Sequence, residues 1–114
     1  MTYTTSLSPL ESRSMVQGWS HPVTDQLLID GTARDLTGAT VAIYFEDCHG
    51  KVRTPQGTVE ITDAATGRVS YTPHVEDLMT DGSPLRQRWR VTEADGSVSF
   101  HPSGSPVRWY LWKN

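Results

Sequence analysis

The sequence has little of what a chain needs for covalent cross-linking, membrane insertion or export. Its 114 residues include a single cysteine, Cys48, so no disulfide can form within the chain. No apolar run reaches the roughly 18 residues that a transmembrane helix requires, and the chain does not open on a basic segment followed by an apolar one. We therefore expect no membrane span and no signal peptide, and a protein that is made and folded in a cytoplasm.

Catalytic and metal-binding motifs are also missing. There is no nucleophile elbow, no glycine loop of the kind that binds phosphates, and no pair of carboxylates on a recognisable scaffold. Cys48 and His49 are adjacent in an expected tight turn, where neighbouring side chains point apart, which disfavours a Cys–His nucleophile. Glu76, Asp77 and Asp81 do not have the spacing of an EF-hand loop. The sequence thus predicts no enzyme activity, cofactor or metal, although strand pairing could bring distant histidines together.

Positive charge is in short supply as well. Ten Lys and Arg residues against thirteen Asp and Glu residues give a formal net charge of −3. This balance gives no reason to expect specific binding to nucleic acid or to an anionic membrane surface.

What the sequence does contain is turn chemistry and two-residue alternation. Nine glycines and seven prolines divide the chain, and the stretch Asp35–Tyr71 is interpreted as a hairpin of β strands. Within Thr40–Glu46, the apolar side chains alternate, and the strand then reverses at a glycine-containing turn. A second strand with Val59 and Ile61 follows, and Asp63–Gly67 turns the chain again. These features predict an antiparallel sheet.

Short strands are expected along the rest of the chain. Pro73–Gly82 is the one plausible helical turn, and we interpret it as a connection that crosses between two sheets. Leu36 is expected to be an apolar residue buried at the end of the core. Seven or so strands with turns about every 8–12 residues are typical of a sandwich, and the change of sheet makes a small barrel less fitting. We predict an all-β, immunoglobulin-like antiparallel β-sandwich of about seven to eight strands over residues 15–114. Its further strands are expected at Met15–Trp19, Gln26–Asp30, Leu85–Glu93, Val98–Phe100 and Pro106–Lys113.

Residues 1–14 are rich in Thr and Ser and show no sustained periodicity. Two interpretations stay open: a frayed terminus, or an arm that becomes ordered only against a partner. In either case the sequence predicts a flexible N-terminal arm.

Three arginines alternate along one expected strand, so Arg86, Arg88 and Arg90 should emerge on the same face. One interpretation is cross-strand pairing with carboxylates such as Glu60 and Glu93 on an outer sheet face. The other is a rigid row of guanidinium groups that bind acidic or carbonyl groups of a neighbouring subunit.

The C-terminal strand carries an excess of aromatic residues. Trp109 should face the core, which places Tyr110 and Trp112 on the opposite face. A second layer or the N-terminal arm could cover them, and so could a partner protein, because Trp, Tyr and Arg dominate interface energetics. The candidate partner interface therefore consists of Arg86, Arg88, Arg90, Tyr110 and Trp112.

Several segments, taken in order, resemble a known family. DLTGATV at 35–41, ATGRVSY at 65–71, RQRWRV at 86–91 and DGSVSFHP at 95–102 are similar to the immunoglobulin-like β-sandwich domain of bacteriophage upper baseplate proteins. The resemblance covers about residues 16–111. It departs from the family in lacking the usual long extension after the domain and in carrying its strand aromatic at Trp89.

The resemblance implies a non-enzymatic structural or assembly protein of a bacteriophage virion, placed in the tail, baseplate or neck. Its partners would be other virion proteins, together with further copies of itself in a symmetric ring. The alternative is a carbohydrate-binding or capsid-decorating β-sandwich module, because exposed Trp and Tyr side chains can stack on sugar faces. The position in the virion stays open.

Overall fold

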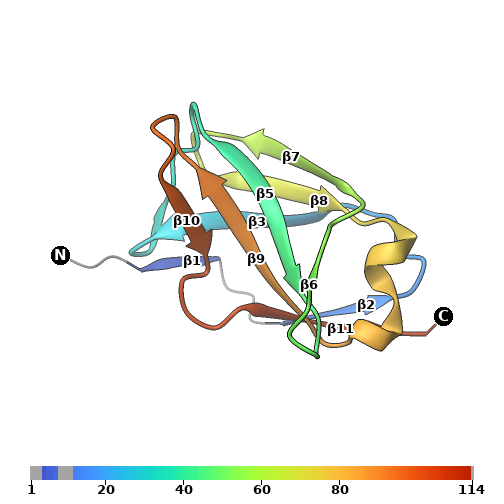
Figure 1. The fold of residues 1–114 in the computed structure, drawn as a ribbon. Coiled ribbons are helices and arrows are strands. Elements are labelled where there is room, and N and C mark those ends of the chain that lie inside the picture. The colour runs from blue at the N-terminus through green and yellow to red at the C-terminus, as the bar shows by residue number, and fades with distance from the viewer. Residues whose placement is uncertain (1–3, 8–11, 114) are drawn as a thin grey trace.

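The computed structural model describes residues 4–7 and 12–113, which form two β-sheets packed face to face (Figure 1). The first sheet has the order β1-β3-β8-β7, with β4 paired to β3, and the second has the order β2-β11-β9-β5-β6, with β10 paired to β9. The strands of the first sheet are β1 (Thr5–Leu7), β3 (Val23–Ile29), β4 (Thr32–Ala33), β7 (Thr58–Asp63) and β8 (Arg68–Thr72). Those of the second are β2 (Ser12–Val16), β5 (Thr40–Glu46), β6 (Val52–Arg53), β9 (Leu85–Thr92), β10 (Val98–His101) and β11 (Val107–Trp112).

This strand order is that of an immunoglobulin-like sandwich. In such domains strands A, B, E and D form one sheet, C, F and G form the other, and variable-type domains add strands after C. Here β1, β3, β8 and β7 correspond to A, B, E and D, while β11, β9, β5 and β6 correspond to G, F, C and C′. The sheets are antiparallel except for the parallel pair β2–β11. The predicted fold class is therefore confirmed.

The described residues contain more strand segments than the seven or eight expected. The first strand is divided, because β1 pairs with β3 in the first sheet whereas β2 pairs with β11 in the second. The last strand is also divided, because β10 and β11 pair with different halves of β9. Pro102 and Pro106 lie between them and have no N–H to donate to a sheet.

The predicted N-terminal arm is corrected wherever the structure describes it. Thr5–Leu7 and Ser12–Val16 are strands, one in each sheet, so these parts of residues 1–14 belong to the sandwich. Residues 1–3 and 8–11 lie outside the described part. The strand expected at Met15–Trp19 also begins and ends earlier, because a turn follows Val16 with Gly18 at φ 94°. Pairing with β3 and β11 stabilises segments whose own alternation is too short to recognise.

The predicted hairpin between Thr40–Glu46 and the strand with Val59 and Ile61 is wrong in its pairing. β5 pairs with β9 and β6, whereas β7 pairs with β8, so the two strands lie in opposite sheets. The hairpins that form in this stretch are β5–β6 and β7–β8, the second of them around the turn that ends at Gly67. Alternation shows which side of a strand is buried, but it does not identify the neighbouring strand.

The core lies between the sheets and is dominated by aromatic side chains. Phe45 packs edge-to-face on Trp109 and on Tyr71, with ring centroids 5.1 and 5.6 Å apart. Fully burying a large apolar side chain contributes about 1.5–3 kcal/mol. Leu36 is buried as predicted. The other buried apolar residues are Met15, Val23, Leu27, Ile43, Val69, Leu78, Leu85, Trp89, Val91, Val107 and Leu111.

A crossing connection joins β8 of the first sheet to β9 of the second, as predicted. It consists of two short 3-10 helices, η1 (Val75–Leu78) and η2 (Thr80–Gly82). Asp77 fixes the connection, because its carboxylate accepts hydrogen bonds from Tyr71 Oη at 2.5 Å and from the backbone N–H groups of His74 and Gln56. Burial and the neighbouring Asp77 raise the pKa of Tyr71. Among the described residues, no helix has the length and apolar character to cross a membrane.

A buried carboxylate links the two sheets at the place where antibody domains carry a disulfide. Asp25 on β3 accepts a hydrogen bond from Trp89 Nε1 on β9 at 2.8 Å and forms an ion pair with Arg13 on β2 at 2.6 Å. Strands β3 and β9 correspond to B and F, which hold the two cysteines of an antibody domain. Burial raises the pKa of the Asp25 carboxyl, while Arg13 and the Trp89 hydrogen bond act in the opposite direction. With one cysteine in the chain, polar bonds take the place of the covalent link.

Candidate functional site

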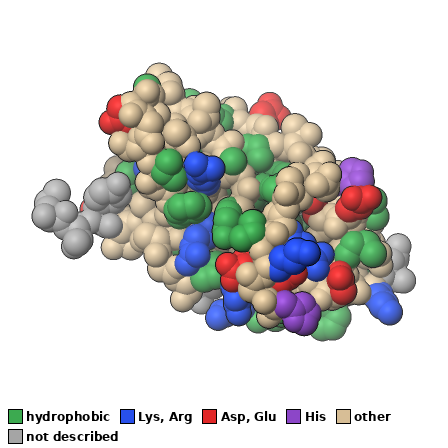
Figure 2. Space-filling view, in the orientation of Figure 1, with side chains coloured by type: hydrophobic (Ala, Val, Ile, Leu, Met, Phe, Trp, Pro, Cys, Tyr) green, Lys and Arg blue, Asp and Glu red, His purple; other side chains and the backbone are tan. Residues whose placement is uncertain are grey.

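The arginine row lies on the outer face of the second sheet. Along β9 the residues Leu85, Gln87, Trp89 and Val91 are buried, and the alternating positions Arg86, Arg88 and Arg90 point away from the core. The prediction that the three arginines share one face is confirmed. Figure 2 views this face and shows blue basic side chains interleaved with green hydrophobic ones over β10, β9 and β5.

The three arginines have different bonding. Arg86 Nη1 forms an ion pair with Glu46 on β5 at 3.0 Å. Arg88 donates from Nε to the carbonyl oxygen of Pro102 at 3.1 Å and from Nη2 to that of Gly104 at 2.6 Å, which fixes its guanidinium on the loop before β11. Arg90 is exposed, and its side chain makes no hydrogen bond or ion pair with the described part of the chain.

The predicted pairing of the arginines with Glu60 and Glu93 is wrong. Glu60 lies on β7 in the first sheet, and Glu93 pairs with Arg34 instead. The carboxylate that does pair with the row is Glu46, directly opposite Arg86. Strand neighbours decide such pairs, and the sequence alone did not establish that β5 neighbours β9.

Two aromatic side chains that were not predicted as site residues lie among the arginines. Tyr44 on β5 is directly opposite Arg88, and Phe100 on β10 is directly opposite Arg90. Their rings pack edge-to-face, with centroids 5.8 Å apart and an interplanar angle of 76°. The alternation of β5 already indicated that Tyr44 points outward, but its neighbours depend on the sheet order.

A hollow of about 410 Å³ opens between these side chains. Ser103, from the loop that Arg88 holds, completes its lining. We refer to it below as the face pocket, lined by Tyr44, Glu46, Arg88, Phe100 and Ser103.

Tyr110 and Trp112 point outward from β11 and are 39% and 58% exposed. Trp112 lies opposite Val16 on β2, which is 45% exposed. No described residue of the N-terminal segment covers these rings, because β2 lies beside β11 in the same sheet. We call Val16, Tyr110 and Trp112 the C-terminal edge.

The structure therefore places the five predicted interface residues on one face but in two separate parts. β11 and β9 are antiparallel, and Trp109 pairs with Leu85. Continued along the strands, this register places Trp112 level with position 82, which is six residues before Arg88. At about 3.3 Å per residue, the C-terminal edge is roughly 20 Å along the strands from the face pocket. Arg86 lies between the two parts, opposite Arg108 on β11.

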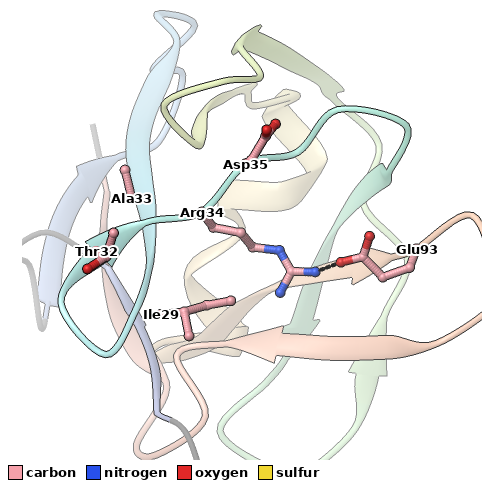
Figure 3. Close-up of a pocket in the computed structure, with 6 residues that line it drawn as sticks. All are labelled: Ile29, Thr32, Ala33, Arg34, Asp35 and Glu93. Atoms are coloured by element: carbon pink, nitrogen blue, oxygen red, sulfur yellow. Dashed lines mark hydrogen bonds and ion pairs between the residues drawn. The ribbon is translucent and has the colours of Figure 1, made fainter.

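A second hollow, also of about 410 Å³, lies outside this face. Arg34 and Glu93, which form an ion pair, are part of its lining (Figure 3). Arg34 is buried, forms an ion pair with Glu93, and donates to Ser99 Oγ at 3.1 Å. Its Nη1 is also 3.2 Å from His101 Nε2. Burial and the Arg34 charge lower the pKa of His101 to about 4, so this imidazole is neutral at pH 7. The network ties the segment after β4 to β9 and β10.

The described residues contain no group of three or more His, Cys, Asp or Glu side chains arranged to hold a metal ion. Cys48 Sγ lies 3.7 Å from the carbonyl oxygen of Asp81, and the Asp47 carboxylate accepts the His49 backbone N–H. No hydrogen bond joins the Cys48 thiol to the His49 ring in the part of the chain that the structure describes.

No protein-family model matches the chain, and no curated protein is similar to it in sequence. One solved chain, described as giving the structural basis for Dscam isoform specificity, is similar over 100% of this chain with 11% identity and a TM-score of 0.43. The match spans 27% of that chain. A similarity at this level identifies neither a family nor a function. The immunoglobulin-like architecture is established by the strand order described above.

Proposed function

We propose that this protein is a non-enzymatic assembly protein of a bacteriophage virion, which docks to neighbouring virion subunits through the outer face of its second sheet. Its position would be in the tail, baseplate or neck, with copies arranged in a symmetric ring. Docking by side-chain contact requires no reaction, so the proposal needs neither a catalytic group nor a cofactor.

The observation that carries the docking part is the uneven distribution of exposed apolar side chains. Of the nine large hydrophobic residues that are exposed among the described residues, six lie on strands of the second sheet and none lies on a strand of the first. Exposed aromatic and arginine side chains gathered on one face are typical of protein interfaces. The six are Val16, Val52, Val98, Phe100, Tyr110 and Trp112.

The virion part of the proposal rests on the resemblance to the immunoglobulin-like domain of phage upper baseplate proteins. The segments that carry it include the loop and strand at 35–41 and the β8 strand with its preceding turn. These two segments build the sandwich, whereas the segments at 86–91 and 95–102 lie on β9 and β10 and also carry Arg86, Arg88, Arg90 and Phe100 of the docking face. The resemblance supports the family and leaves the partner undetermined.

A carbohydrate-binding module is the second candidate, favoured by the exposure of Trp112. A flat ring on a sheet edge can stack on a sugar face. A glycan array separates the two: a specific signal that disappears in Trp112→Ser would favour the sugar-binding candidate, whereas an array without signal would count against it.

Mass spectrometry of purified phage particles tests the proposed function directly. The particles are purified from a culture of the phage whose genome encodes the protein, and they are washed at high salt. The protein should be present at a fixed copy number relative to a major tail protein. Its absence from intact particles that contain all major tail proteins would contradict the proposal.

A further inference from the structure

The outer face of the second sheet differs in charge from the rest of the molecule. Among the described residues, four arginines project from it, on β9 and β11, against one glutamate on β5, a formal charge of +3. The whole chain carries −3, so the remainder carries −6. This face therefore attracts a negatively charged partner and repels a positively charged one. The arginines are Arg86, Arg88, Arg90 and Arg108.

The face pocket lies within this positive region and already has an ordered wall. Tyr44 and Phe100 form an edge-to-face pair, which offers apolar surface to an inserted side chain. Arg88 is held by two carbonyl oxygens, so its guanidinium does not have to be ordered when a ligand binds. A guanidinium carries five N–H groups, of which these two bonds use two, so N–H groups remain for a ligand.

The charges around the pocket favour a carboxylate. Glu46 is already paired with Arg86, so it leaves Arg88 and the unpaired Arg90 to act on a ligand. Arginine binds a carboxylate with two parallel hydrogen bonds, which a neutral amide cannot reproduce. The volume of about 410 Å³ suffices for one or two side chains, but not for a folded element.

From these observations we propose that the face pocket is a specificity site for an acidic segment of a partner protein. One apolar or aromatic side chain of that segment packs on Tyr44 and Phe100, while a neighbouring Asp or Glu carboxylate binds Arg88 and Arg90. This inference rests on the proposed docking function and adds the chemistry of the partner to it.

A nucleic acid strand is the other anionic polymer that could combine arginine with aromatic contacts. The geometry favours the peptide for two reasons. The two rings stand at 76° to each other and so do not form a flat platform for successive bases. A strand that extended beyond the pocket would also meet a molecule that is otherwise strongly acidic.

The test is an NMR titration of the full chain with three capped peptides. Their sequences are acetyl-Ser-Glu-Phe-Glu-Ser-amide and the same peptide with both Glu replaced by Gln or by Lys. Backbone and arginine Nε–H signals are recorded. The Glu peptide should shift the signals of Tyr44, Arg88, Phe100 and Ser103 and bind at least about tenfold more tightly than the Gln peptide. The Lys peptide should not bind, and added salt should weaken the Glu peptide.

Variants identify the groups responsible. Arg90→Gln should weaken binding of the Glu peptide severalfold and leave binding of the Gln peptide unchanged. The fold should not be disturbed, because the Arg90 side chain has no described partner. Phe100→Ser should weaken both peptides. Trp112→Ser, on the C-terminal edge, is the matched control and should change neither. The amide spectrum of each variant reports whether it is folded.

Several outcomes would overturn the inference. Equal affinity for the Glu and Gln peptides would show that the site does not recognise a carboxylate. Signal shifts confined to the C-terminal edge would show that the peptide binds there and not in the face pocket. An octathymidine or a cellohexaose that bound the pocket more tightly than the Glu peptide would replace the ligand class. Self-association through this face that excluded the Glu peptide would make a second copy the occupant. If the Glu peptide does not bind the face pocket but the protein is present in virions, the docking function stands without this specificity. If the Glu peptide binds but the protein is absent from virions, the virion assignment is wrong and the binding site stands.

Discussion

The two outer faces of this sandwich have the same strand architecture but different surfaces. The outer positions of the first sheet are mostly short hydroxyl side chains, including Thr24, Thr58, Thr62 and Thr72, with no exposed large hydrophobic residue on its strands. Among the described residues, the outer positions of the second sheet carry four arginines and six exposed large apolar residues. The buried core lies on the inner faces of both sheets, and we propose that the difference between the outer faces reflects what each face contacts. Substitutions can test whether that difference is functional.

The largest expected effect comes from the interior that both faces share. Asp25→Ala removes the acceptor of both Arg13 and Trp89 Nε1 and leaves a buried guanidinium unpaired, so it should lower the free energy of unfolding by about 3–5 kcal/mol. Urea denaturation followed by tryptophan fluorescence measures this. Asp63→Ala, an exposed carboxylate, is the control and should change stability by no more than about 0.5 kcal/mol. A small effect at Asp25 would mean that this link between the sheets is dispensable.

Acid should weaken the second sheet before the first. The pKa of His101 is about 4 in the folded protein and about 6.5 when unfolded. Between these values the unfolded chain binds a proton that the folded chain does not, so stability is fully present above pH 6.5 and is lost as the pH falls towards 4. The loss is on the order of 3 kcal/mol at about 1.4 kcal/mol per unit.

Hydrogen exchange at pH 7 and pH 4.5 measures this effect strand by strand. Protection should fall first in β9 and β10, with that of β3 and β8 persisting longer. His101→Gln should show a shallower decline in unfolding free energy over the same range. An unchanged slope in that variant would exclude His101 as the cause.

A charge reversal separates docking from folding. Arg90→Glu should weaken association with the partner or between copies by about tenfold or more, because a repulsive charge replaces an attractive one beside Phe100 of the face pocket. Its melting temperature should stay close to that of the unmodified chain, since the Arg90 side chain forms no hydrogen bond or ion pair with the described residues. Thr24→Glu places the same charge on the first sheet. Sedimentation velocity should show normal association for Thr24→Glu, and equal loss in both variants would mean that the two faces do not differ in function.

The smallest effect is expected at the C-terminal edge. Trp112→Ser should change stability by less than about 0.5 kcal/mol, because the ring is mostly exposed. It should weaken association only if the docking surface extends along β11 as far as Trp112. A titration calorimetry comparison with Arg90→Glu therefore measures how far the surface reaches.

The sequence predicted the faces of individual strands well and their neighbours poorly. Alternation correctly placed Phe45 and Trp109 inside and Arg88 and Trp112 outside, because side-chain direction is a local property. The pairing of β5 with β9 joins segments about 45 residues apart, and no local pattern encodes it. For this reason Tyr44, Phe100 and the face pocket were missed. β1 and the first three residues of β2, Ser12–Ser14, were missed because short Thr- and Ser-containing segments become strands only through their neighbours.

A cryo-electron reconstruction of the intact particle that contains this chain tests the central claim most directly. The account predicts that a neighbouring subunit covers Arg90, Phe100 and the face pocket, and that the threonine-rich face of the first sheet is open to solvent. A reconstruction in which the first sheet is covered and the second is exposed would contradict it.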